Sequence, residues 1–262
     1  MTVRDKVCVV TGGANGIGRA LAERFAQEGA RAVVVADLDL AQAQQVAAGF
    51  GGSAFACDVS HEDQLRTLIE QVEDGIGPIG LFCSNAGISV EGGANVPDEQ
   101  WRRIMDVNFM SHVWTARHLV PRMIQRGGGA LLQTVSAAGL LTQIGSAPYA
   151  VTKHAAQAFA EWLSVSYGHV GLQVYSLCPQ GVRTNLLADA ANHCMEFLVE
   201  TAIEPADVAG AVIKGFEAEQ FLILPHPDVA EYFRRKAADY DRWLRGMRKL
   251  QASTGVNKIL GV

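Results

Sequence analysis

The chain has 262 residues, of which 49% are hydrophobic and 19% are charged, and its formal net charge is −5. This composition is typical of a globular protein and argues against disorder, a collagen triple helix or a coiled coil. The acidic balance gives no overall basic field for nucleic acid, and no apolar run approaches the roughly 20 residues of a membrane span. We therefore expect neither a nucleic-acid partner nor insertion into a membrane.

The N-terminal segment and the cysteines favour a cytoplasmic location. Gly12 and Gly13 end the first apolar run, which is too short and too polar for a signal peptide. The five cysteines form no Cys-x-x-Cys pair and suit buried thiols in a reducing compartment. The seven histidines lack the spacing of metal ligands, so no metal site is predicted.

Short apolar runs alternate with segments of helical periodicity through the first part of the chain. The apolar runs predict strands at residues 6–11, 31–37, 53–58, 79–84, 130–135 and 172–178. The periodic segments predict helices at residues 16–29, 40–50, 61–74, 98–126 and 146–168. Strands that are apolar on both faces and alternate with helices indicate a parallel sheet covered on both sides. We therefore predict an α/β fold, a doubly wound Rossmann-type single domain of three α/β/α layers over residues 1–262.

The pattern becomes less regular after Pro179. Residues 186–201 are apolar and free of helix breakers, which predicts a helix, and we expect residues 186–203 to form a mobile substrate lid. The remaining segments are predicted as a helix at 205–219, a last strand at 221–224 and a C-terminal helical extension at 227–262.

The C-terminal extension differs in charge from the rest of the chain. Residues 231–250 hold seven basic and three acidic residues and carry +4, which leaves 15 basic and 24 acidic residues, or −9, elsewhere. One helical face there would carry Tyr240, Trp243, Leu244, Met247 and Leu250. This apolar stripe fits two arrangements: it packs on an acidic neighbouring subunit, or the helix is solvated on its own subunit.

The turn after the first strand reads Thr11-Gly12-Gly13-Ala14-Asn15-Gly16-Ile17-Gly18. Glycines there permit a tight bend and let a diphosphate approach the next helix, whose dipole and free N–H groups favour an anion. An ordinary glycine-rich turn has the same composition. The position between the first strand and the first helix nevertheless favours dinucleotide binding.

Asp37 ends the second predicted strand, 19 residues after Gly18. A carboxylate there can accept both ribose hydroxyls of NAD and repels the 2′-phosphate of NADP. No Arg or Lys occupies positions 12–16 or 38 to offset that repulsion. The sequence therefore favours NAD, although Asp37 also suits a helix N-cap and the two roles are compatible.

Further motifs follow in a fixed order. Asp58-Val59 comes after the third strand, Asn85-Ala86-Gly87 after the fourth, and Asn108 lies in the fourth predicted helix. Ser136 precedes Tyr149 by 13 residues, and Tyr149-Ala150-Val151-Thr152-Lys153 is a Tyr-x-x-x-Lys sequence. With the glycine-rich turn, this order and spacing resembles the classical short-chain dehydrogenase/reductase (SDR) family over residues 5–185.

The resemblance implies a catalytic set of Asn108, Ser136, Tyr149 and Lys153, in which Asn108 holds a water that links Lys153 to solvent. The cofactor residues that it implies are Gly12, Asn15, Gly16, Ile17, Gly18, Asp37, Leu38, Asp58, Val59, Asn85, Ala86, Gly87, Tyr149, Lys153, Pro179, Val182 and Thr184. The residues expected to face the substrate are Ser136, Gln143, Tyr149 and Gln180.

The residue types suit the oxidation of a secondary alcohol, in which a proton is removed as hydride leaves carbon. A tyrosine, with a pKa near 10, is a weak base at neutral pH. Lys153, one helical turn on, and a positively charged nicotinamide both favour the phenolate. Ser136 can donate a hydrogen bond to the substrate oxygen. We therefore predict an NAD(H)-dependent oxidoreductase with Tyr149 as general acid/base.

A second Tyr-x-x-x-Lys sequence runs from Tyr232 to Lys236. It lies beyond the last predicted strand, and the residue 13 before it is Glu219, which donates no hydroxyl. Spacing to a serine and to the sheet therefore selects Tyr149 as the catalytic tyrosine.

One motif departs from the family pattern Pro-Gly-x-Val-x-Thr. The chain reads Pro179-Gln180-Gly181-Val182-Arg183-Thr184, with Gln180 in place of the expected glycine. The matching residues imply a wall that cups the nicotinamide. Gln180 either faces the substrate or is a tolerated turn residue.

The candidate substrate pocket comprises residues 88–96, 140–144 and 186–197. Gln143 and His193 are its few polar members, and the apolar ones are Leu140, Leu141, Ile144, Leu186, Leu187, Met195 and Phe197. No basic cluster suggests a phosphate or CoA substrate. We expect a medium-sized hydrophobic alcohol or ketone, of alicyclic, aromatic or steroid type, unless some of these groups pack as core instead.

Two other functions remain to be separated from this one. An NAD-binding regulatory or scaffold protein on the same fold would need none of the four catalytic residues. A sugar-nucleotide epimerase or dehydratase has a larger C-terminal substrate domain than the residues after Thr184 provide.

The two longest predicted helices indicate an assembly. Residues 98–126 and 146–168 carry more apolar surface than one sheet face can cover, which predicts a homo-oligomer. The SDR resemblance implies that these helices form the seam between subunits. We expect a tetramer of two-fold symmetry, with a dimer as the alternative.

Overall fold

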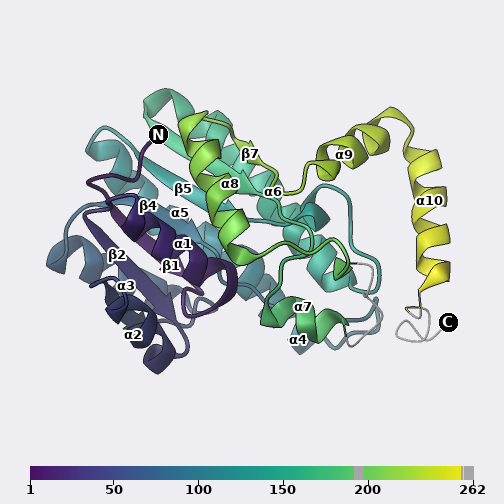
Figure 1. The fold of residues 1–262 in the computed structure, drawn as a ribbon, viewed down its shortest axis with the longest axis horizontal. Coiled ribbons are helices and arrows are strands. Elements are labelled where there is room, and N and C mark those ends of the chain that lie inside the picture. The colour runs from purple at the N-terminus through teal and green to yellow at the C-terminus, as the bar shows by residue number, and fades with distance from the viewer. Residues whose placement is uncertain (192–197, 255, 257–262) are drawn as a thin grey trace.

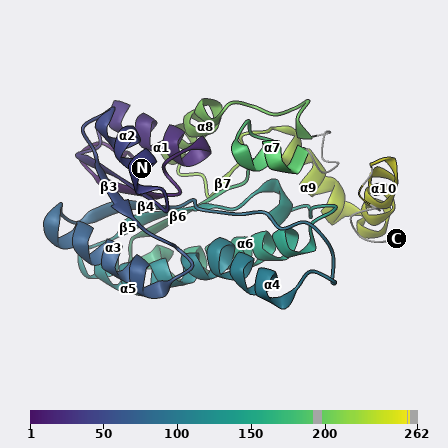
Figure 2. The same ribbon diagram turned by 90° about the horizontal axis from the view of Figure 1, so that it is seen from below.

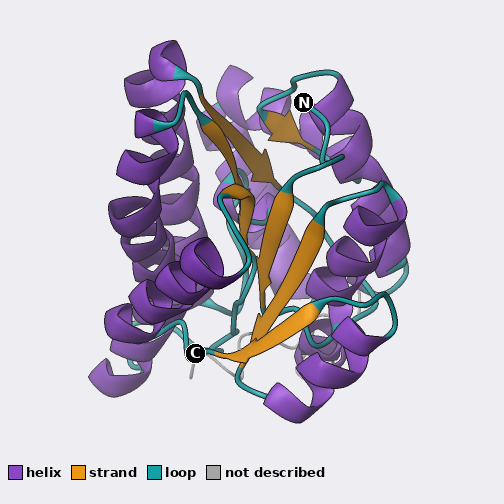
Figure 3. Cartoon of the chain, turned by 90° about the vertical axis from the view of Figure 1, so that its left-hand side faces the viewer, coloured by secondary structure: helices purple, strands orange, loops and turns teal. Residues whose placement is uncertain are grey.

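The computed structural model describes residues 1–191, 198–254 and 256, and these form a seven-stranded, all-parallel sheet between two layers of helices (Figures 1 and 3). The strand order is β3-β2-β1-β4-β5-β6-β7. The strands are β1 (Val7–Thr11), β2 (Ala32–Asp37), β3 (Ser53–Ala56), β4 (Ile79–Ser84), β5 (Gly129–Thr134), β6 (Leu172–Leu177) and β7 (Leu222–Ile223). The main helices are α1 (Gly16–Gln27), α2 (Leu40–Ala48), α3 (Glu62–Gly75), α4 (Asp98–Met105), α5 (Ser111–Gln125), α6 (Ala147–Tyr167), α7 (Asn185–Ala191), α8 (Pro205–Glu217), α9 (Asp228–Ala238) and α10 (Tyr240–Ser253). The predicted doubly wound fold is confirmed.

The central strands are buried on both faces, as their continuous apolar sequences predict. All five residues of β1 are buried, and Val10 pairs with Val35 on one side and with Cys83 on the other. Because all strands run parallel, the residues that follow their carboxyl ends meet at one edge of the sheet. That edge is where the predicted site residues lie.

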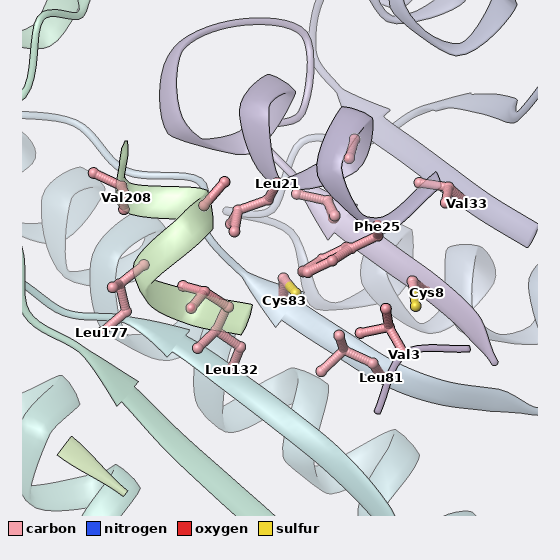
Figure 4. Packing of buried hydrophobic residues seen from close by; sticks show 14 of the residues in the cluster. Val3, Cys8, Leu21, Phe25, Val33, Leu81, Cys83, Leu132, Leu177 and Val208 are labelled. Atoms are coloured by element: carbon pink, nitrogen blue, oxygen red, sulfur yellow. The ribbon is translucent and has the colours of Figure 1, made fainter. Parts of the chain in front are cut away.

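Two separate hydrophobic clusters hold the helix layers to the sheet. On one face, Leu21 and Phe25 of α1 and Val208 of α8 pack against strand residues such as Cys83 and Leu132 (Figure 4). On the other face, α3, α5 and α6 pack against alternate residues of the same strands, and Figure 2 shows these helices together below the sheet. The alternation of side chains along each strand supplies both clusters from one set of strands.

The predicted continuous helix at 98–126 is instead broken by a π-helical segment, η1 (Asp106–Met110), between α4 and α5. Asn108 lies in this segment and is fully buried, with both atoms of its side-chain amide bonded to the backbone of Ile88. A π-helical turn accommodates an extra residue while the chain stays helical. The apolar periodicity therefore continues across the break, and the sequence pattern does not reveal it.

The chain after Pro179 is less continuous than the sequence predicts. Of the helix predicted at 186–201, the structure shows α7, which ends at Ala191; residues 192–197 lie outside the described part of the chain, and with them much of the predicted lid at 186–203. The basic unit at 231–250 forms two helices rather than one, because Asp239 adopts an extended conformation and caps α10 by accepting from Arg242 N.

Helix α10 stands apart from the sheet beside α9 and contains no buried residue (Figure 1). None of the helices among the described residues is long and apolar enough to cross a membrane.

Candidate active site

A cavity of about 1190 Å³ opens at the carboxyl edge of the sheet. Every predicted site residue except Asn108 lines it, including the glycine-rich turn, the residues after β2, β3 and β4, the Ser136–Tyr149–Lys153 set and the turn after β6. Asn108 lies behind the wall, where its side chain contacts Ile88. The fold thus brings together residues that are up to 172 positions apart, from Gly12 to Thr184.

The glycine-rich turn packs so closely that side chains at Gly12 or Gly18 would clash with neighbouring backbone atoms. Gly12 has a φ of 62°, and a Cβ there would lie 2.8 Å from the Cα of Ala86. A Cβ on Gly18 would collide with the carbonyl oxygen of Gly12. Asn85 braces the turn, because its side-chain amide donates to the carbonyl oxygens of Thr11 at 3.0 Å and Gly12 at 3.3 Å.

The first turn of α1 offers donors to an anion. Its N-cap residue, Asn15, makes no side-chain capping hydrogen bond, so the N–H groups of the first turn remain available. The glycine cradle and these donors fit the diphosphate of a dinucleotide. The residues of this turn therefore suit a dinucleotide cofactor, as the sequence predicts.

Asp37 and Asp39 have different roles although they are two residues apart. One oxygen of Asp37 accepts from Ala14 N at 2.9 Å and the other from Asp39 N at 3.1 Å. Asp39 is the N-cap of α2 and accepts from Gln42 N at 3.0 Å. The helix-capping alternative considered for Asp37 therefore belongs to Asp39, and Asp37 stays in the cavity wall beside the glycine-rich turn.

Asp58 follows β3 and lines the cavity. Partial burial would raise its pKa, but hydrogen bonds from Ser60 and the charges of Arg103 and His61 hold the pKa below its usual value. Val59, beside it, is buried, whereas Leu38 is 64% exposed. The carboxylate is therefore charged at neutral pH and available to a polar group in the cavity.

Ser136, Tyr149 and Lys153 meet where β5 leads into the loop before α6. Ser146 caps α6 by accepting from Tyr149 N at 3.3 Å, which fixes Tyr149 in the first turn and Lys153 one turn later. Lys153 is 3% exposed, its Nζ donates to Thr134 O at 3.0 Å, and Nζ lies 5.6 Å from the centre of the Tyr149 ring. The ammonium and the phenol therefore share one buried environment.

Burial sets the protonation of this pair. Burial raises the pKa of the Tyr149 phenol above its usual value, and a hydrogen bond with Ser136 opposes the shift. Burial lowers the pKa of Lys153 to about 8. At neutral pH the site therefore holds a protonated tyrosine beside a lysine that exchanges its proton close to physiological pH.

The turn after β6 is held by a histidine that the sequence did not single out. His226 is 6% exposed; its Nδ1 accepts from Gln180 N at 3.1 Å and its Nε2 donates to Gly181 O at 3.0 Å. Burial lowers its pKa, which keeps the ring neutral as this pairing requires. A lone histidine 46 residues from its partner gives no local sequence signal.

The substrate side of the cavity agrees only in part with the predicted pocket. Leu141, Ile144, Leu186 and Leu187 line it, whereas Leu140 packs in a core cluster below the wall. His193, Met195 and Phe197 lie outside the described residues.

The sequence also missed one wall, which α9 and α10 supply. Its large apolar residues are Tyr232, Trp243, Met247 and Leu250, and the charged residues Asp228, Arg235, Asp239 and Arg242 line the same wall. The apolar stripe of the C-terminal helix is divided: Trp243, Met247 and Leu250 line the chain's own cavity, while Tyr240 is 56% exposed.

Comparison with known proteins identifies the family. The short chain dehydrogenase family model matches residues 6–194. The chain is 34% identical to 1-deoxy-11-beta-hydroxypentalenate dehydrogenase of Streptomyces exfoliatus, over 87% of this chain and 86% of that protein. It is 31% identical to the 3beta-hydroxysteroid dehydrogenase of Mediterraneibacter gnavus (78% and 75% covered) and 31% identical to the cyclohexanol dehydrogenase of an Acinetobacter species (71% and 76% covered).

A solved structure shares the fold. A short-chain dehydrogenase/reductase from Burkholderia phymatum, determined in complex with NAD, superposes with a TM-score of 0.83 at 26% identity, covering 92% of this chain and 96% of that one. The chain therefore belongs to the short-chain dehydrogenase/reductase family and is an oxidoreductase.

Proposed function

We propose that this protein is a cytoplasmic dehydrogenase that interconverts a secondary alcohol of a hydrophobic cyclic compound and the corresponding ketone, with NAD as cofactor. The observation that carries the proposal is the convergence of Ser136, Tyr149 and Lys153 on the cavity that also holds the glycine-rich turn. A protein that only binds a dinucleotide has no need of an acid/base group there. The described cysteines are buried and unpaired, which suits a reducing compartment.

Tyr149 is the group that exchanges a proton with the substrate oxygen. With its pKa raised, the phenol stays protonated at neutral pH and so has a proton to donate to the ketone oxygen in the reducing direction. In the oxidising direction the phenolate is needed, and the nearby ammonium of Lys153 stabilises it. Ser136, which is hydrogen-bonded with Tyr149, orients the substrate oxygen toward the phenol. When bound, the nicotinamide would supply the hydride acceptor or donor.

The preference for NAD rests on Asp37. Its carboxylate lies in the cavity wall and is tied to Ala14 N of the glycine-rich turn at 2.9 Å. An acid at this place accepts ribose hydroxyls and repels a 2′-phosphate. Positions 12–16 and 38 contain no basic residue to offset the repulsion.

The substrate class rests on the walls and on the relatives. Leu141, Ile144, Trp243 and Met247 make the substrate side largely apolar. The relatives named above are dehydrogenases of a hydroxypentalenate, a hydroxysteroid and cyclohexanol, all hydroxylated cyclic compounds. Gln143 and Gln180, which also line the cavity, are the polar groups placed to meet such a substrate.

A direct assay tests the proposal. The protein is mixed with NAD or NADP and a panel of secondary alcohols (cyclohexanol, a bicyclic terpene alcohol, a 3β-hydroxysteroid and a short acyclic alcohol), and formation of reduced cofactor is followed by absorbance. We expect turnover of cyclic alcohols with NAD. Tight NADH binding with no turnover of any alcohol or ketone would instead support a regulatory binding protein.

A further inference from the structure

The second Tyr-x-x-x-Lys sequence, at 232–236, has no part in the proposed proton transfer, yet the structure buries its lysine. Lys236 of α9 is 8% exposed, and its Nζ donates to the carbonyl oxygen of Leu140 at 2.6 Å. Nζ also lies 5.6 Å from the centre of the Tyr240 ring. It forms no ion pair with any described carboxylate. Burying an ammonium without a counter-charge is costly, so a hydrophobic residue would serve simple packing better.

The bond of Lys236 joins two segments that would otherwise meet only through side-chain packing. Leu140 belongs to the loop that leaves Ser136, and the next residues, 141–144, line the cavity. Lys236 lies near the end of α9, three residues before Asp239, where the chain turns into α10. The contact spans 96 positions in sequence and fixes the C-terminal helices relative to the serine loop.

The fixed helices present large apolar side chains to the cavity, with the charged residues Asp228, Arg235, Asp239 and Arg242 among them. Tyr232 and Trp243 pack against the core cluster that contains Leu140 and Leu141, and Met247 and Leu250 continue the wall along α10. Helix α10 has no buried residue and stands beside the body of the molecule (Figures 1 and 2). Its placement therefore depends on its first turn and on α9, which is where Lys236 acts.

We propose that Lys236 is a positioning residue that holds α9 and α10 as the outer wall of the substrate pocket, and that this wall selects alcohols with a bulky fused-ring body. On this proposal, Ser136 and Tyr149 hold the hydroxyl, and the wall contacts the part of the substrate that extends away from it. A single-ring alcohol is bound by the inner part of the pocket and does not reach the wall. This inference rests on the proposed function and adds a specificity element to it.

The test compares two substrates in a lysine series. KM and kcat are measured for cyclohexanol and for a 3β-hydroxysteroid in wild type, Lys236→Met and Lys236→Arg, with Lys249→Met as the matched control. Lys249 is exposed on α10 and does not line the cavity. We expect Lys236→Met to raise KM for the steroid about tenfold or more, with kcat for cyclohexanol and the Kd of NADH within about twofold. Arginine, which also donates to a carbonyl, should restore part of the loss, and Lys249→Met should behave as wild type.

If Lys236→Met does not fold, a second variant tests the same inference. Trp243→Ala, in the partly buried first turn of α10, removes one large side chain from the wall and leaves Lys236 in place. It should raise KM for the steroid by a clearly larger factor than KM for cyclohexanol. Equal changes in KM for both substrates, or a wild-type enzyme that oxidises cyclohexanol but not the steroid, would overturn the inference while leaving the dehydrogenase activity established. A wild-type protein that oxidises neither alcohol would contradict the proposed function itself.

Discussion

At the scale of single residues, neighbouring acids show how position decides role. Asp39 has a purely structural role: it caps the first turn of α2 by accepting a hydrogen bond from Gln42 N. Asp37, at the end of β2, points into the cavity wall and organises Ala14 N. Both are aspartates in a strand-to-helix turn, so composition alone does not tell them apart.

We expect Asp37→Ala to relax the preference for NAD. Removing the carboxylate removes both the ribose acceptor and the repulsion of a 2′-phosphate, so the ratio of kcat/KM for NAD to that for NADP should fall at least about tenfold, or ~1.4 kcal/mol. Steady-state kinetics with both cofactors measures this. Asp39→Ala is the matched control: it should cost about 1 kcal/mol in the free energy of unfolding through the lost cap and leave the ratio unchanged. A wild-type preference for NADP would contradict the assignment.

His112 should make the stability of the protein depend on pH. It is fully buried on α5, and burial together with the charge of Lys153 lowers its pKa to about 3, against an opposing hydrogen bond with Gln133. As pH falls below the usual histidine value of about 6.5, the unfolded chain takes up a proton and the folded one does not. The free energy of unfolding therefore falls, by about 2 kcal/mol at pH ~5 from this group alone.

Urea denaturation of wild type and His112→Leu at about pH 7.5 and about pH 5 checks this effect. The variant should lose about 2 kcal/mol less than wild type on acidification. His169→Leu, at an exposed position, should follow wild type. Identical pH dependence of wild type and His112→Leu would show that His112 is not buried neutral.

At residue scale, the sequence predicts best what is encoded locally. The family resemblance identifies Ser136, Tyr149 and Lys153 from their short spacing, after one strand and in the helix that follows it. His226 and Lys236 escape prediction because their partners lie 46 and 96 positions away. Nothing in a stretch such as Tyr232–Lys236 shows which distant carbonyl its lysine will meet.

At the scale of elements, the turn after β6 depends on support from another element. Gln180 takes the place of the glycine usual in the family, and its backbone N–H is accepted by the ring of His226, which precedes α9. The same ring donates to Gly181 O. The β6 turn and the start of the C-terminal helices are therefore one hydrogen-bonded unit beside the predicted nicotinamide site.

Removing this support should loosen the turn. We expect His226→Phe, which leaves a buried N–H and a buried carbonyl without their partner, to lower the free energy of unfolding by about 1–3 kcal/mol and to raise the Kd of NADH several-fold. Denaturant unfolding and fluorescence titration measure the two effects. His226→Gln keeps one donor and one acceptor, so its free energy of unfolding and its Kd for NADH should lie between those of wild type and His226→Phe. A His226→Phe variant that binds NADH as tightly as wild type would refute the role of His226 in holding the turn.

Elements themselves were predictable where their signal is periodic and continuous. The apolar strands and the helices between them were found because the central strands are buried on both faces and therefore carry continuous apolar sequences. The π-helical segment at Asp106–Met110 was not found, since buried positions recur every three or four residues from Ile104 to Met123 and show no break there. The break at Asp239 depends on a single capping side chain between two helices of similar composition.

At the scale of the whole molecule, α6 presents apolar side chains that no described element covers. Val165 is 84% exposed, Trp162 53% and Val151 49%, and Trp162 stacks on Phe159 with ring centres 6.1 Å apart. A row of exposed apolar groups on one helix indicates an interface. We therefore keep the prediction of a homo-oligomer, a tetramer or a dimer.

Light scattering tests the assembly. We expect wild type to have a mass well above the 28.0 kDa of one chain, and the Trp162→Glu/Val165→Glu double variant to fall toward it. Tyr240→Glu tests whether the outward side of α10 contributes to the interface between subunits. An unchanged mass would indicate that this helix is solvated on its own subunit. A single wild-type species near 28.0 kDa would rule out the oligomer.

The central claim concerns the whole site: that Tyr149, among two tyrosines with the same Tyr-x-x-x-Lys context, exchanges the proton with substrate. Turnover of the best cyclic alcohol with NAD and the Kd of NADH are measured for Tyr149→Phe and for Tyr232→Phe. We expect Tyr149→Phe to lose activity by about 10²–10⁴-fold with NADH affinity within about threefold, because only the hydroxyl is removed. Tyr232→Phe should retain turnover. Substantial activity in Tyr149→Phe, or its loss in Tyr232→Phe alone, would contradict the account.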